Sequence, residues 1–183
     1  MSKAVLISIR PEWVQKIGEG KKTIEVRKTR PKLIPPFKCY IYCTLPRKNK
    51  SHVMRLSICD DDGETREMNA KVVGEFTCNT VTNLFSNSRF WLNEDDVLQT
   101  CLSAAEMRKY ANGANGLYGW HISDLKIYDT PKELPQFRKC CGTQDCDKCQ
   151  FWENTGEYAG CLTSEERRLN RAPQSWCYVE ELK

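Results

Sequence analysis

The segment that most constrains the fold of this chain is 20–27, which reads GKKTIEVR. It directly follows a short helical pattern and then alternates as a strand does, so Thr23, Glu25 and Arg27 share one face. The two aliphatic residues between them are expected to point into a core. An acid and a guanidinium two positions apart on a strand are about 7 Å apart at the backbone, so their side chains can meet. This outward face, with Lys22 at its start, is either a solvated ion pair or part of a site.

The remainder of the chain reads as many strands and few helices. A helix is expected from Pro11, because proline suits the first helical position, and it ends at Gly18 or Gly20. Further strands are expected at residues 3–9, 37–44, 70–82, 117–128 and 176–181, with short helices at 93–100 and 103–110. Ser103 and Glu106 form a capping-box pattern at the start of the last helix. This set of elements indicates an α+β, mainly β fold of the small-barrel type.

Positive charge is concentrated in the first third of the chain. Residues 1–58 hold 14 Lys and Arg against 3 acids, whereas residues 59–183 hold 14 against 21. The split predicts a basic N-terminal surface that meets nucleic acid or a phosphorylated small molecule, unless the two portions pack together and neutralise one another. No run of about 18 apolar residues occurs, and the first residues are too short an apolar segment for a secretory signal. A cytoplasmic protein without a membrane partner is therefore expected.

Two segments, 7–13 and 20–27, together resemble the ASCH domain, whose signature is G-x-K-x-x-E-x-R. The signature is matched at Gly20, Lys22, Glu25 and Arg27. The similarity covers roughly residues 3–128 and the closing strand. It implies a PUA-like small β-barrel with peripheral helices, a cleft lined by the signature residues, and a role in RNA or nucleotide metabolism. Many stand-alone chains of this kind look like phage or prophage products.

The resemblance implies first a site that binds RNA or a modified nucleotide. Cations contact phosphate, a carboxylate accepts hydrogen bonds from a base or ribose, and an exposed aromatic residue stacks on the base. The candidate ligand-binding residues are Arg10, Lys22, Thr23, Glu25, Arg27 and Trp120. Trp13 and Tyr118 are alternative stacking residues, and each aromatic residue has the plain alternative of a core position.

A hydrolase is the second possibility. The superfamily that the chain resembles includes small bacterial amidohydrolases, which deacetylate acetylcytidine with a Lys, a Thr and a Glu. Other members look like ribonucleases. The Lys of the amidohydrolases falls on Lys22 and their Thr on Glu25, and Glu75 is the candidate for the third residue. Since a carboxylate does not replace a hydroxyl nucleophile, catalysis here needs Glu25 as general base, with Lys22 or Arg27 to steady an oxyanion or a phosphate. His121 is the candidate acid. A third possibility is a protein-interaction module, such as a phage factor that docks its basic face on a host protein.

Ten of the 11 cysteines fall into two groups. Five lie singly among apolar neighbours and are expected to be buried small hydrophobes: Cys39, Cys43, Cys59, Cys78 and Cys101. A later cluster has the spacing of a structural zinc site, with Cys141, Cys146, Cys149 and Cys161 as ligands and Cys140 as a substitute for Cys141. The alternative is a loose loop that oxidises to disulfides.

A closed four-thiolate zinc site serves folding or partner contact, and no organic cofactor is expected. The expected domain organisation is a barrel formed by residues 1–134 together with 174–183. A Cys-rich insertion, clipped by zinc, occupies residues 135–173 before the last strand.

Overall fold

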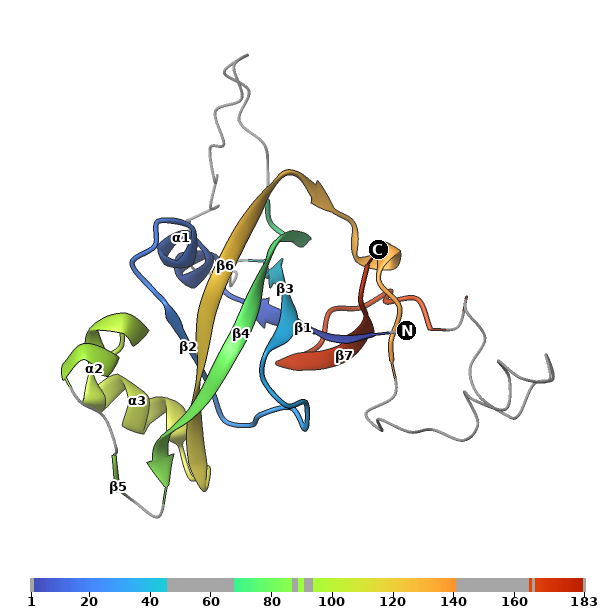
Figure 1. The fold of residues 1–183 in the computed structure, drawn as a ribbon. Helices are drawn as coiled ribbons and strands as arrows, with labels where there is room; N and C mark the ends of the chain where they lie inside the picture. The colour runs from blue at the N-terminus through green and yellow to red at the C-terminus, as the bar shows by residue number, and fades with distance from the viewer. Residues whose placement is uncertain are drawn as a thin grey trace.

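One curved sheet organises the chain (Figure 1). The computed structural model describes residues 2–45, 68–86, 89–90, 94–140, 165 and 167–182. Within them the strand order is β2-β6-β4-β3-β1-β7, and β5 pairs with β4. The strands are β1 (Lys3–Ile9), β2 (Ile24–Arg27), β3 (Phe37–Cys43), β4 (Lys71–Ser86), β5 (Arg89–Phe90), β6 (Gly116–Lys132) and β7 (Trp176–Glu180). Only β1 and β3 run parallel, and the other described pairs are antiparallel.

Three short helices lie outside the sheet. They are α1 (Pro11–Gly18), α2 (Glu94–Thr100) and α3 (Ala104–Ala111), and a 3-10 turn, η1, covers Leu134–Gln136. As predicted, α1 begins at Pro11, and the capping box of Ser103 and Glu106 opens α3. Figure 1 shows α2 and α3 together on the side of β2 and β6 that faces away from β3. The α+β, mainly β prediction is confirmed.

Both faces of the sheet are covered by apolar residues. Val5 and Ile7 of β1 belong to an inner cluster that also holds Phe76 and Trp120. Leu6, between them, belongs to a second cluster on the other face. This double burial explains why the β1 sequence is continuously apolar and does not alternate.

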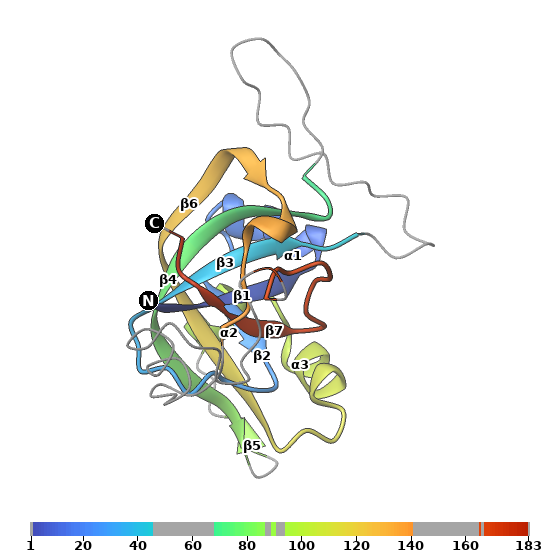
Figure 2. The ribbon, with the colours of Figure 1, turned by 90° about the vertical axis from the view of Figure 1, so that its right-hand side faces the viewer.

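The long strands β4 and β6 bend the sheet toward a barrel. They pair along their length with several register shifts, and Figure 2 shows both strands curving around β3 and β1. A Cβ atom on Gly74 would lie 2.5 Å from the carbonyl oxygen of Lys126, so this close approach requires glycine. Asp124, at a bend in β6, has φ of 48°. β2 and β7 are the two end strands of the described sheet and do not pair with each other. The side chain of Arg27 from β2 spans the gap between them.

Parts of the predicted Cys-rich insertion pack against the barrel. Phe137 is fully buried and Leu169 is 2 % exposed, both in the second apolar cluster. Lys139 forms a bridge with Val179 of β7. Among the described residues, none of the helices has the length and apolar character needed to cross a bilayer.

Candidate functional site

The signature segment enters the barrel through a left-handed turn. Gly20 has φ of 71°, a conformation that glycine adopts without strain, and it turns the chain from α1 toward β2. All four residues of β2 are buried. The alternation predicted for this strand is present, but its polar face does not point to solvent as expected. The side that carries Val26 lies under α3, whereas Glu25 lies opposite Trp120 and faces the inside of the barrel.

Lys22 is a buried cation with three acceptors. Its side chain is 2 % exposed, and its Nζ donates to the carbonyl oxygens of Ile24 at 2.8 Å and Thr100 at 2.7 Å. Oε2 of Glu25 lies 3.4 Å from the same Nζ. Because the last carbonyls of a helix have no partner within the helix, the contact with Thr100 also caps α2. Lys22 therefore ties β2 to α2.

Glu25 and Arg27 form the second half of this buried network. Nη2 of Arg27 lies 2.9 Å from Oε1 of Glu25 and donates to the carbonyl oxygen of Ser8 at 2.7 Å. Nη1 reaches Oγ of Ser175 at 3.4 Å. Since Ser8 lies in β1 and Ser175 precedes β7, the guanidinium spans the gap between the two ends of the sheet. Both oxygens of Glu25 are thus engaged by cations, and the side chain is 7 % exposed.

Two buried N–H groups beside this network have no acceptor among the described residues. They are Nε of Arg27 and Nε1 of Trp120. Trp120 pairs in register with Glu25, so both donors project from neighbouring strands into the same interior. A buried donor without a partner costs free energy, and such groups in native proteins often meet a water or a ligand.

A ring of half-exposed aromatic residues and cations surrounds this end of the barrel. Nζ of Lys16 lies 4.9 Å from the ring centroid of Trp13, Nζ of Lys28 lies 5.4 Å from that of Tyr110, and the Arg30 guanidinium lies 5.7 Å from that of Tyr118. Tyr110 is 38 % exposed. Burial raises the pKa of its hydroxyl, while nearby Arg27 and Arg10 oppose that rise. We call this set the signature rim: Arg10, Trp13, Lys16, Lys28, Arg30, Tyr110 and Tyr118.

Several predicted site residues occupy other positions. Trp120 is fully buried in the inner apolar cluster, so it is a core residue and not an exposed stacking surface. Thr23 is engaged by α2, where its Oγ1 lies 3.1 Å from Oε1 of Gln99. Arg10 precedes α1 and is exposed, 3.9 Å from Glu12.

The predicted catalytic partners of Glu25 lie on different faces. His121 pairs with Ile24, so it points to the opposite side of β2 and β6 from Glu25, and its Nε2 lies 3.1 Å from Oγ1 of Thr82. Burial lowers the pKa of His121. Glu75 faces the second cluster and accepts a 2.5 Å hydrogen bond from Tyr128. The described arrangement does not bring either residue to Glu25.

Residues that the sequence did not single out complete the site. Tyr110, Ser8, Ser175 and Thr100 contact or surround the signature residues, yet they come from α3, β1, the segment before β7 and α2. Ser8 and Thr100 contribute backbone carbonyl oxygens and Ser175 a hydroxyl, and no local sequence pattern marks such positions. Their proximity follows only from the curvature of the sheet, which brings β2 near β1 and the segment before β7.

The predicted metal ligands Cys141, Cys146, Cys149 and Cys161 lie outside the described residues. Within the described part of the chain, no three His, Cys, Asp or Glu side chains are grouped to hold a metal. Two hollows of the described surface also lie away from the signature. One, of about 240 Å³, is next to Arg138 and Arg168, and the other, of about 560 Å³, is next to Lys3 and Phe37.

Solved structures of ASCH proteins resemble this chain in fold. The crystal structure of ASCH from Zymomonas mobilis aligns with a TM-score of 0.54 and 18 % identity, over 97 % of this chain and 88 % of that one. Two single-residue mutants of the Zymomonas mobilis protein align with TM-scores of 0.55 and 0.54, identities of 17 % and 18 %, and coverage of 97 % and 98 % of this chain and 89 % and 92 % of theirs. No family model and no curated protein sequence matches the chain. The chain therefore has the fold of an ASCH-domain protein.

Proposed function

We propose that this chain binds single-stranded RNA, or a single nucleotide, at the signature rim. The observation that carries the proposal is the pairing of cations with aromatic rings around one buried carboxylate. Trp13, Tyr110 and Tyr118 are partly exposed and each has a cation within 6 Å of its ring centroid. Aromatic faces for bases beside cations for phosphates are the two elements that single-strand binding sites combine.

Charge complementarity supports a polyanionic ligand. From Val26 to Cys59 the sequence contains no acid, and the described part of that segment carries Lys28, Arg30 and Lys32. All three are exposed. An acidic protein surface would meet the same charges, and the three partly exposed aromatic rings beside them are the feature that stacking of bases would use.

In this proposal the signature residues position the rim and hold one part of the ligand. Lys22 and Glu25 fix the path of β2, from which Lys28 and Arg30 continue. The ligand's own acceptor, such as a base carbonyl or a phosphate oxygen, would satisfy Nε of Arg27, which is buried without an acceptor among the described residues. Glu25 acts as the counter-ion of Arg27 and Lys22.

Fluorescence anisotropy with a labelled single-stranded octanucleotide tests the proposal. Each cation removed from contact with phosphate lowers the slope of log K against log salt concentration by about 0.7 for a single strand. Lys28→Ala and Arg30→Ala are expected to weaken binding and to reduce that slope.

Lys132→Ala is a matched control, because Lys132 also lies over a tyrosine, with Nζ 5.2 Å from the ring centroid of Tyr128, at the far end of β6. The control is expected to bind like the wild type. Equal losses in all three variants, or no binding by the wild type at low salt, would contradict the proposal.

A further inference from the structure

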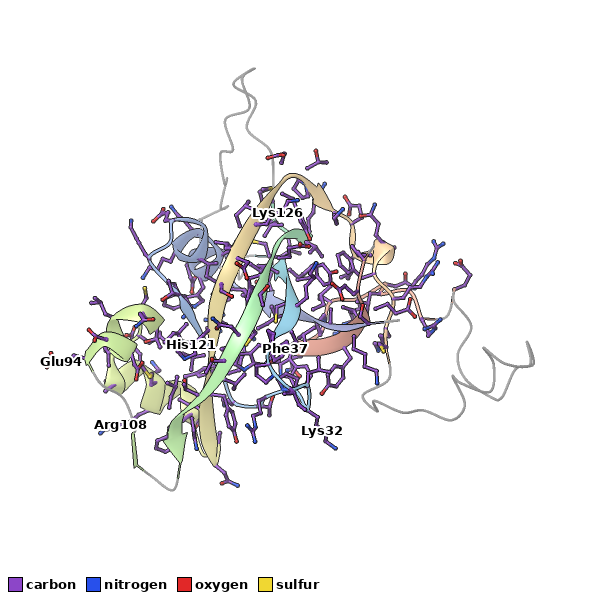
Figure 3. The ribbon with its side chains drawn as sticks, viewed as in Figure 1. Lys32, Phe37, Glu94, Arg108, His121 and Lys126 are labelled. Carbon is purple, nitrogen blue, oxygen red and sulfur yellow. The ribbon has the colours of Figure 1, made fainter. Side chains whose placement is uncertain are left out.

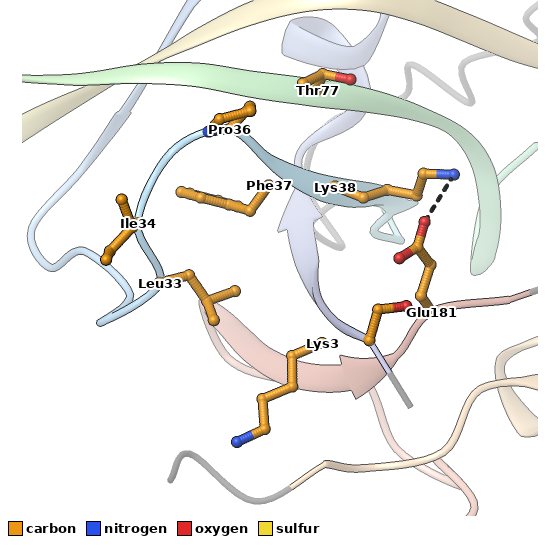
Figure 4. A pocket seen from close by; sticks show the side chains of 9 residues that line it. Lys3, Leu33, Ile34, Pro36, Phe37, Lys38, Thr77 and Glu181 are labelled. Atoms are coloured by element: carbon orange, nitrogen blue, oxygen red, sulfur yellow. Dashed lines mark ion pairs between the residues drawn. The ribbon is translucent and has the colours of Figure 1, made fainter. Parts of the chain in front are cut away.

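A second hollow lies at the other end of β1 from the signature rim. Its volume is about 560 Å³, which is within the range of small-ligand sites. One wall is apolar and comes from the loop before β3, with Leu33, Ile34, Pro36 and Phe37. Figure 4 shows Leu33, Ile34 and Phe37 on one side of the hollow and the ion pair of Lys38 and Glu181 on the other.

The opposite wall provides one cation that the described protein does not neutralise. Lys38 is held between Glu75 and Glu181, with Nζ to Oε1 distances of 3.4 and 3.3 Å. Lys3, at the edge of the hollow in Figure 4, has a buried Nζ with no hydrogen-bond partner among the described residues. The two cations and two carboxylates of this region balance in number, but both carboxylates contact Lys38, so Lys3 is the cation to which a phosphate can bind.

The apolar wall carries a side chain that burial within this chain does not explain. Ile34 is 78 % exposed, whereas Phe37, which lines the same hollow, is 6 % exposed. Together they offer an apolar wall against which a flat group can lie. The two walls together suit a flat base with an attached phosphate.

The signature rim and the hollow are joined by one loop. Residues 28–36 leave β2 at the rim and reach the hollow, and the amide of Lys32 donates to the hydroxyl of Tyr178 at 2.7 Å, which holds the loop on β7. Every charged residue of this loop is a cation: Lys28, Arg30 and Lys32. A nucleic-acid strand that extends from the rim along this loop would therefore pass no acidic side chain of the loop that repels its phosphates.

We propose that the hollow is a second nucleotide subsite for the same single strand that binds at the signature rim. This inference rests on the proposed function. Five residues of β1, at about 3.3 Å each, separate Ser8, whose carbonyl oxygen accepts from Arg27 beside the rim, from Lys3 at the hollow. The span of about 17 Å requires a strand of several nucleotides, so a mononucleotide can occupy only one of the two subsites.

The first test compares Ile34→Asn with Leu98→Asn. Leu98 is a matched control because it is 77 % exposed and lies in α2. Figure 3 shows Glu94 of that helix at the far left of the molecule and Lys32 at the lower right. Both substitutions leave the net charge unchanged. Loss of one base contact predicts about a fivefold weaker affinity of Ile34→Asn for an octanucleotide and no change for a nucleoside monophosphate.

The second test is photochemical cross-linking with two octanucleotides, one that carries 4-thiouridine at its 5′ end and one that carries it at its 3′ end. Trypsin releases residues 33–38 as one peptide, and one of the two labelled oligonucleotides should cross-link there. Cross-links confined to the signature rim, together with equal affinities of both variants, overturn the second subsite while leaving the proposed function intact. Failure of the wild type to bind any oligonucleotide overturns both, and cross-linking to 33–38 that Ile34→Asn reduces supports the subsite.

Discussion

The ammonium of Lys22 lies 2.7 Å from the carbonyl oxygen of Thr100, the last residue of α2. Two residues 78 positions apart are joined here by a hydrogen bond from a buried cation. The positive charge sits where the helix dipole is negative, and it also faces Glu25. The signature lysine therefore has a structural role that does not depend on any ligand.

Lys22→Met should destabilise the fold strongly. The variant leaves two carbonyl oxygens and one carboxylate oxygen without their cation, so the free energy of unfolding is expected to fall by about 3–5 kcal/mol. Urea denaturation measures the loss. Lys21→Met is the matched control, because Lys21 pairs with Glu19 at the surface with 69 % of its side chain exposed. A midpoint for Lys22→Met equal to that of Lys21→Met would mean that the buried network does not stabilise the protein.

Glu25→Gln distinguishes a counter-ion from a catalytic base. Both carboxylate oxygens of Glu25 are paired with cations, and His121 lies on the other face of the sheet, so wild-type protein is expected to show no turnover of acetylcytidine or RNA. The variant should lose about 3 kcal/mol of stability, because Lys22 and Arg27 stay buried without their anion. Product formation by chromatography is the measurement. Wild-type turnover that Glu25→Gln abolishes, in protein shown to be folded, would establish the hydrolase instead.

His121 should make stability depend on pH just below neutrality. Burial lowers its pKa in the folded state from the ordinary value of 6.5, so the unfolded chain binds the proton more readily. Stability is thus complete above pH 6.5 and falls as pH decreases toward the folded-state pKa. Thermal unfolding between pH 7.5 and 5 checks this. His121→Gln keeps a hydrogen-bonding group near Thr82 and should lose less stability than the wild type over that interval; an identical pH profile would rule out His121 as the cause.

The zinc site stays a prediction. Purified protein is expected to contain about one zinc per chain, bound by Cys141, Cys146, Cys149 and Cys161. Metal content measured by mass spectrometry should fall in Cys146→Ser and stay unchanged in Cys101→Ser, since Cys101 belongs to the described part of the chain, where its thiol contacts the carbonyl oxygen of Lys21. Metal-free wild-type protein that unfolds at the same temperature with and without added zinc would exclude a structural site.

The strands and helices were largely predictable because local sequence determines them. Pro11 begins α1, Ser103 begins α3, and uninterrupted apolar residues mark β1 as covered on both faces. The predicted ends of β4 and β6 fell short by up to four residues, because pairing between these strands extends both beyond their apolar parts.

The environment of the signature was not predictable from its alternation. A period of two shows that Glu25 and Arg27 share a face, but it does not show whether another element covers that face. The structure covers both sides of β2, one with α3 and one with the rest of the barrel. Burial of the charged side is possible because Lys22 and Arg27 neutralise Glu25. The acceptors that complete the network belong to Ser8, Thr100 and Ser175, which are distant in sequence.

The position of β1 has a consequence for folding. This strand lies between β3, which follows soon after it, and β7, and Ser8 at its end bonds to Pro173, 165 residues away. Contacts of such high sequence separation are slow to form. On a ribosome, one edge of the first strand stays unpaired until β7, at residues 176–180, has emerged. Exposed strand edges recruit other chains, so the period of synthesis is when this protein is most prone to aggregate.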